Sequence, residues 1–235
     1  MLLPIVSFLY ASVGHGGASG YLALMALFSF SPETMKPTAL LLNLFVAGIS
    51  FYYYYKEGYF NKKLFFSFAV TSIPFAFLGG TIEIDASIYK KVLAILLVFA
   101  ILKMLNVFGK ESESTKQVKL WQGFLVGGVI GFFSGLIGIG GGIILTPLIL
   151  LLHWGNMKEA AAVSALFIWV NSASGLVGQV SSGVHIESDT FVLVVVALVG
   201  GVLGGYLGSK KINNQSLRYI LAFVLAIACV KLIIT

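Results

Sequence analysis

Hydrophobic residues fill most of this chain in long runs, which short groups of charged and turn-forming residues separate. Eight runs can be traced, at about residues 2–30, 38–55, 64–82, 88–108, 121–152, 159–181, 190–209 and 215–234. A helix needs about 20 residues to cross the hydrocarbon core of a bilayer. Six runs fit that length, so the pattern predicts an all-α membrane protein with about eight hydrophobic segments.

The first and fifth runs are longer than one span, at about 30 residues each, and each has a glycine cluster near its middle. The clusters are residues 14–20 and 135–142, and Pro147 follows the second. Glycine inside a helix costs about 1 kcal/mol relative to alanine, and proline removes a backbone donor. We therefore expect each of these runs to be broken at its glycines, into half-helices or a re-entrant pair.

The glycine landmarks recur in the same order in the two halves of the chain, first at an offset of 124 residues and then at 125. The matched positions are residues 14–18 with 138–142, Gly58 with Gly183, and residues 79–80 with 204–205. They predict two homologous four-segment repeats, at residues 1–108 and 121–235, joined by a polar linker at 109–120. If the broken segments do not cross the membrane, the repeats are inverted, and otherwise they are parallel. The pattern leaves both arrangements open.

Composition supports the membrane class. Hydrophobic residues make up 58% of the chain and charged residues only 10%, against about 25% charged residues in soluble domains. The expected surroundings are therefore a lipid bilayer. The net charge of +6 comes mainly from lysines between the runs, where bilayers attract them, so no nucleic acid partner is expected. The basic residues divide almost evenly between the two sides and set no orientation.

Charged side chains are nearly absent from the predicted spans, so the candidate chemistry lies in broken backbone. Helix starts at a glycine cluster expose N–H groups with a partial positive charge, and such groups bind oxyanions. The predicted substrate-binding residues are Gly14, His15, Gly16, Gly17, Asn43, Gly138, Gly140, Gly141, Gly142, Ser164 and Asn171. In the alternative interpretation the glycines only permit close helix crossing, and the polar side chains only join helices.

No metal site or cofactor is predicted. No histidine lies at metal-ligand spacing from a carboxylate or cysteine, and the chain has no GxxxxGK[ST] motif for ATP. The glycines at 138–142 lack the preceding strand and the downstream acid of a dinucleotide-binding loop.

The two glycine motifs resemble those of the sulfite exporter TauE/SafE family. The resemblance is closest at residues 135–142 followed by Thr146-Pro147-Leu148, and looser at residues 14–17, where Ala23 replaces a usual proline. It implies a permease of the plasma (cell inner) membrane that exports sulfite, sulfonates or related anions. We therefore predict a secondary transporter of a small oxyanion that works by alternating access. An anion channel of the same architecture is the main alternative, a membrane enzyme is a lesser one, and homo-oligomerisation is left open.

Overall fold

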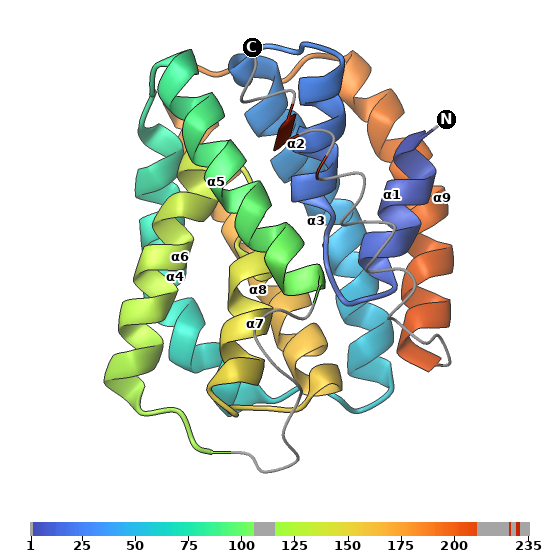
Figure 1. Ribbon diagram of the computed structural model, residues 1–235, viewed down its shortest axis with the longest axis vertical. Helices are drawn as coiled ribbons and strands as arrows, with labels where there is room; N and C mark the ends of the chain where they lie inside the picture. Colours follow the sequence, from blue (N-terminus) through green and yellow to red (C-terminus); the bar gives the residue numbers. More distant parts are fainter. Residues whose placement is uncertain (1, 106–115, 211–225, 227–228, 231–235) are drawn as a thin grey trace.

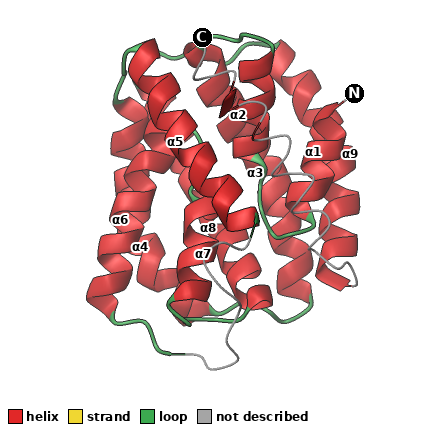
Figure 2. Ribbon diagram, viewed as in Figure 1, coloured by secondary structure: helices red, strands yellow, loops and turns green. Residues whose placement is uncertain are grey.

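The computed structural model describes residues 2–105, 116–210, 226 and 229–230. Within these residues every regular element is a helix, and loops connect the helices (Figures 1 and 2). The helices are α1 (Leu2–Ala11), α2 (Ala18–Leu27), α3 (Pro32–Lys56), α4 (Lys62–Thr81), α5 (Ala86–Met104), α6 (Leu120–Ile137), α7 (Gly142–Leu151), α8 (Met157–Ser181) and α9 (Asp189–Lys210). The predicted run at 215–234 and residues 109–115 of the predicted linker fall almost entirely outside the described residues.

Both long runs are broken at their glycines. The first run forms α1 and α2, and the fifth forms α6 and α7. The residue before α2 is Gly17, with φ 101°, and the residue before α7 is Gly141, with φ 80°. A side chain strongly disfavours this left-handed conformation, which glycine adopts at little cost. The glycines therefore fix where each half-helix begins.

Five of the described helices are long and apolar enough to cross a membrane, namely α3, α4, α6, α8 and α9. The outer face of α9 shows why a bilayer suits this surface, since Val192, Val195 and Val199 are each about 60% exposed there. Such apolar side chains are favourable against lipid and costly in water. The helices α3 and α8 contact each other and are the most buried of the five. They form the centre of the bundle.

Glycines at four-residue spacing allow two helix pairs to approach closely. In α6, a Cβ at Gly127, Gly131 or Gly135 would overlap the backbone carbonyl of a residue in α4. In α9, a Cβ at Gly200, Gly204 or Gly208 would overlap a carbonyl of α1 or of Ser12, just after it. Small residues repeated in this way are typical of close helix packing in membranes. The close-crossing interpretation thus applies to these two stripes.

Candidate functional site

The two glycine loops meet at the side chain of Asn43, in α3. A Cβ built on Gly16 would overlap Asn43 Oδ1, and one built on Gly140 would lie 2.5 Å from Asn43 Nδ2. Ile168 of α8 borders both loops, because its Cγ2 would lie 2.9 Å from the first Cβ and 2.8 Å from the second. One glycine from each half of the chain therefore touches the same pair of side chains.

Asn43 places an amide group at this meeting point. The side chain is fully buried, and its Nδ2 donates to Ser172 Oγ at 3.2 Å. Its Oδ1 has no hydrogen-bond partner within the described part of the chain. Buried polar atoms are normally satisfied, so an unpartnered one calls for an explanation. Because Oδ1 only accepts, this amide can bond an anion only through the second N–H of Nδ2.

Both half-helices begin in the buried interior without a side-chain cap. Gly17 precedes α2 and Gly141 precedes α7, and neither helix has a side-chain hydrogen bond at its N-cap. Ala18 and Ser19 at the start of α2 are buried, as are Gly142 and Ile143 at the start of α7. The first N–H groups of a helix have no partner within the helix. Two buried helix starts beside one amide make an arrangement suited to binding an anion.

A second group of polar side chains links the first glycine loop to α7 and α8. His15 is 6% exposed, and its Nε2 lies 3.1 Å from Thr146 Oγ1. The Thr146 hydroxyl donates to Ser164 Oγ at 2.8 Å. On the other side of the ring, Nδ1 lies 2.9 Å from the carbonyl oxygen of Val13. The predicted residues His15 and Ser164 are therefore joined through Thr146.

We predict that replacing Thr146 with valine lowers stability by about 1–3 kcal/mol, because both His15 and Ser164 lose a buried hydrogen-bond partner. Thermal unfolding of the purified protein in detergent measures the change. Thr81→Val is the matched control, since the Thr81 hydroxyl bonds Leu78 O within its own helix near the surface. Equal unfolding temperatures for the two variants would contradict a joining role for Thr146.

The other predicted residues occupy three kinds of position. Gly142 lies against the Ile168 side chain, while Gly14 packs on Ala161 and Gly138 packs on the backbone of Lys36. Asn171 turns back along its own helix, where Nδ2 donates to Phe167 O at 2.7 Å. None of the hydrogen bonds described joins Asn171 to a glycine loop. Ser172 makes the bond to Asn43 instead, one position further along α8.

Thr146 and Ile168 belong to this site, yet the sequence did not single them out as binding residues. Thr146 follows Gly142 by four positions and so lies on the same face of α7. That spacing is a signal from which Thr146 could have been identified. Among the described residues, no group of three or more His, Cys, Asp or Glu side chains is placed to hold a metal ion.

Several membrane-length helices around broken half-helices define a multi-pass membrane protein of the transporter class. The chain belongs to the sulfite exporter TauE/SafE family, which it matches over residues 2–232. Membership confirms the resemblance seen in the glycine motifs, and it is consistent with the plasma membrane.

Relatives of the same length carry transporter names. The chain is 34% identical to the probable membrane transporter protein y4hK of Sinorhizobium fredii, covering 97% of this chain and 94% of that protein. It is 28% identical to a probable membrane transporter protein of Methanocaldococcus jannaschii, covering 96% and 92%. A third relative, the probable membrane transporter protein YdhB of Bacillus subtilis, is 26% identical over 91% and 90%. No solved structure matches the chain.

Proposed function

We propose that this protein is a secondary transporter that moves a small oxyanion, sulfite or an organosulfonate, across the plasma membrane by alternating access. The observation that carries the proposal is the meeting of Gly16 and Gly140 at Asn43, beside two uncapped helix starts. The anion is held by backbone N–H groups of both loops, assisted by the Asn43 amide. A site of this kind needs no full positive charge, because helix N-termini supply partial ones.

The chemistry of the ligand follows from the donors. Backbone N–H groups can come close to a ligand only where side chains are absent, and glycine provides that access. Oxyanions with several equivalent oxygens can accept from more than one loop at once. The description of the family names sulfite, and sulfite and sulfonates have this shape and charge. They are therefore the first substrates to test.

The movement rests on two inverted repeats, at residues 1–108 and 121–235. Support comes from matching contacts, because α6 packs on α4 as α1 packs on α9. The amide N–H of Lys116 donates to His153 O, which brings the start of α6 next to the end of α7. In Figure 1 this pair begins and ends at the lower end of the bundle, whereas α1 begins and α2 ends toward the upper end. Broken segments that begin at opposite ends of the bundle favour inverted repeats over parallel ones.

Flux assays with purified protein test the function. We expect proteoliposomes to take up radiolabelled sulfite with saturable kinetics, and unlabelled sulfonate to compete if both share the site. Empty liposomes give the background. Uptake of both anions at the background rate would contradict the proposal.

Electrical recording separates a transporter from an anion channel. In planar bilayers with a sulfite gradient, alternating access predicts no unitary current, because each cycle moves only one or a few ions. Discrete conductance steps that depend on the protein would replace the transporter proposal with a channel.

A further inference from the structure

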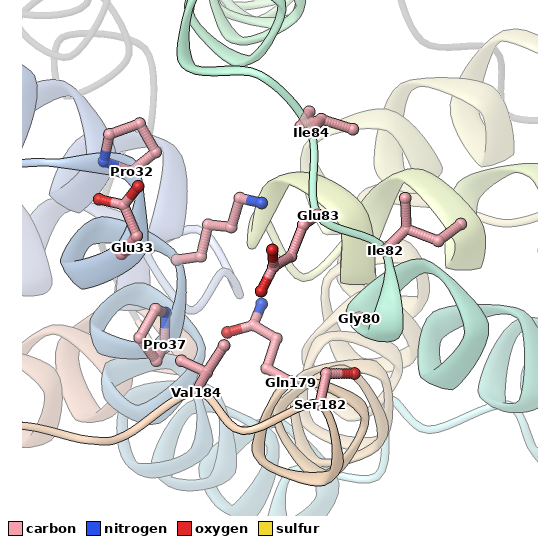
Figure 3. A pocket seen from close by; sticks show the side chains of 11 residues that line it. Pro32, Glu33, Pro37, Gly80, Ile82, Glu83, Ile84, Gln179, Ser182 and Val184 are labelled. Carbon is pink, nitrogen blue, oxygen red and sulfur yellow. The ribbon is translucent and has the colours of Figure 1, made fainter.

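A cavity of about 120 Å³ opens at the end of the bundle where α3 begins. Its walls come from the start of α3, the connection between α4 and α5, and the end of α8 (Figure 3). Lys36 supplies the one positive charge in the lining, and Glu33 and Glu83 supply two negative charges. Gln179 of α8 and Ser182, the residue just after this helix, contribute polar groups.

Lys36 connects this cavity directly to the second glycine loop. A Cβ built on Gly138 would lie 3.1 Å from both Cα and the carbonyl oxygen of Lys36. The residue that lines the cavity thus also touches the loop that leads to Gly140 and Asn43. A ligand beside the Lys36 side chain is therefore next to the wall of the central site.

The Lys36 ammonium is available for a ligand. The side chain is half-buried, and its Nζ lies 5.2 Å from the ring centroid of Tyr89. Tyr89 itself is fully buried and donates to Ile137 O at 3.1 Å. No described residue makes a hydrogen bond or an ion pair with the ammonium. A cation away from bulk water attracts an anion more strongly than a fully exposed one.

Glu83 and Glu33 both lie close enough to the Lys36 ammonium to attract it electrostatically. Glu33 and Glu83 are both exposed, so water and salt screen them. Gln179 is 2% exposed; its Nε2 lies 3.4 Å from Gly135 O, and its Oε1 has no partner among the described residues. Because Oε1 only accepts, this amide can assist a bound anion only through the second N–H of Nε2.

The position that the repeat relates to this cavity, at the other end of the bundle, is occupied by side chains. An offset of 125 residues relates Lys36 to Ala161 and Gln179 to Tyr54. Tyr54 is 1% exposed and donates to Ser12 O at 3.1 Å. Lys158 Nζ lies 5.5 Å from the Tyr54 ring centroid and donates to Gly208 O at 2.9 Å. The side chains at that position therefore already have partners, whereas the Lys36 ammonium has no hydrogen bond or ion pair within the described residues.

We propose that Lys36, with the amide of Gln179, forms an access site that binds the transported oxyanion before it reaches the glycine loops. The proposal rests on the proposed function and adds to it a residue outside the central site. Among the residues that line this cavity, the Lys36 ammonium is the one full positive charge that the anion meets. The backbone N–H groups of the glycine loops, which carry no full charge, then bind the anion. Lys36 sets the apparent affinity, while the central site sets the turnover.

The test uses Lys36→Cys in a background with Cys229→Ser, which removes the single native cysteine. In sulfite flux assays we expect KM to rise about tenfold, since one charge-assisted contact is lost. The maximal rate should stay within about twofold. Alkylation with 2-bromoethylamine rebuilds a lysine-like ammonium and should restore KM, whereas alkylation with iodoacetamide, which adds a neutral amide, should not. A role in folding alone would not depend on the charge of the adduct.

Lys91→Cys in the same background is the matched control, because Lys91 is an exposed lysine of α5; its KM should not change. Saturable wild-type flux with an unchanged KM in Lys36→Cys would overturn the access site and leave the proposed function intact. A KM that responds to Glu83→Gln but not to Lys36→Cys would also overturn it, in favour of a cation site. If wild-type protein shows no flux, the proposed function fails. In that case thermal stabilisation by sulfite still tests the access site, which is overturned if Lys36→Cys and wild type respond alike.

Discussion

Alanine at Gly140 is expected to abolish sulfite flux while leaving the protein folded. The new methyl group would lie 2.5 Å from Asn43 Nδ2 and 2.8 Å from Ile168 Cγ2, so the two side chains that border both loops must move. The left-handed backbone of Gly140, with φ 72°, adds a strain of roughly 1–2 kcal/mol. That cost is tolerable for a stable fold, but displacement by an ångström at a binding site is not. Proteoliposome flux and size-exclusion chromatography measure the two effects.

Gly183→Ala provides the matched control. Gly183 has φ 90° and no atom within 4 Å of a built Cβ, so alanine there brings the same kind of backbone strain without any contact. Gly183→Ala should lose only the stability that the backbone strain costs, Gly140→Ala should lose somewhat more because Asn43 and Ile168 must also move, and only Gly140→Ala should lose flux. Gly16→Ala extends the test to the first loop, since its Cβ would overlap Asn43 Oδ1. Full flux in both loop variants would remove the glycine loops from the site.

The sequence predicted the breaks in the first and fifth runs because glycine acts locally. Several glycines close together make a continuous helix costly wherever they occur, and the half-helix boundaries follow. The sequence also placed Gly16, Gly140 and Asn43 among the predicted substrate-binding residues, and both glycines do lie against Asn43. The sequence did not determine which α8 side chain faces Asn43. Successive residues of a helix point about 100° apart, so neighbouring residues face different partners. Asn171 and Ser172 are neighbours in sequence, but only Ser172 reaches Asn43.

Lys36 shows a different limit of what the sequence alone can predict. From the sequence it is a lysine near the end of a run, and such lysines usually extend to the headgroups. Its role depends on a contact with Gly138, about 100 residues away along the chain. Residue type and spacing carry no information about a pairing of this kind. The prediction of two repeats likewise rests on order and spacing, and the structure adds matching contacts as support.

Glycine has two roles in this fold, and the spacing of the glycines along the chain distinguishes one role from the other. The loop residues Gly17, Gly140 and Gly141 have positive φ and allow the backbone to turn. The glycines of α6 recur every four residues in regular helix and allow α4 to come close. A substitution in the loops should therefore affect transport first, and one in the stripe should affect folding first.

Gly131→Ala is accordingly expected to destabilise the protein by about 1–3 kcal/mol, as overpacking of a close interface does. Its Cβ would overlap the backbone of Ser72 in α4, and a backbone cannot move aside as a side chain can. Gly128→Ala on the same helix is the control, because its Cβ would make ordinary contacts with the Phe75 ring, at 3.6 Å, and with Thr71 Cβ, at 3.8 Å. Alanine is the better helix former by about 1 kcal/mol, so this control should be as stable as wild type or more stable. Thermal unfolding in detergent, monitored by tryptophan fluorescence, compares the two variants. If Gly131→Ala unfolds at or above the unfolding temperature of Gly128→Ala, the glycine stripe between α4 and α6 is not a packing interface.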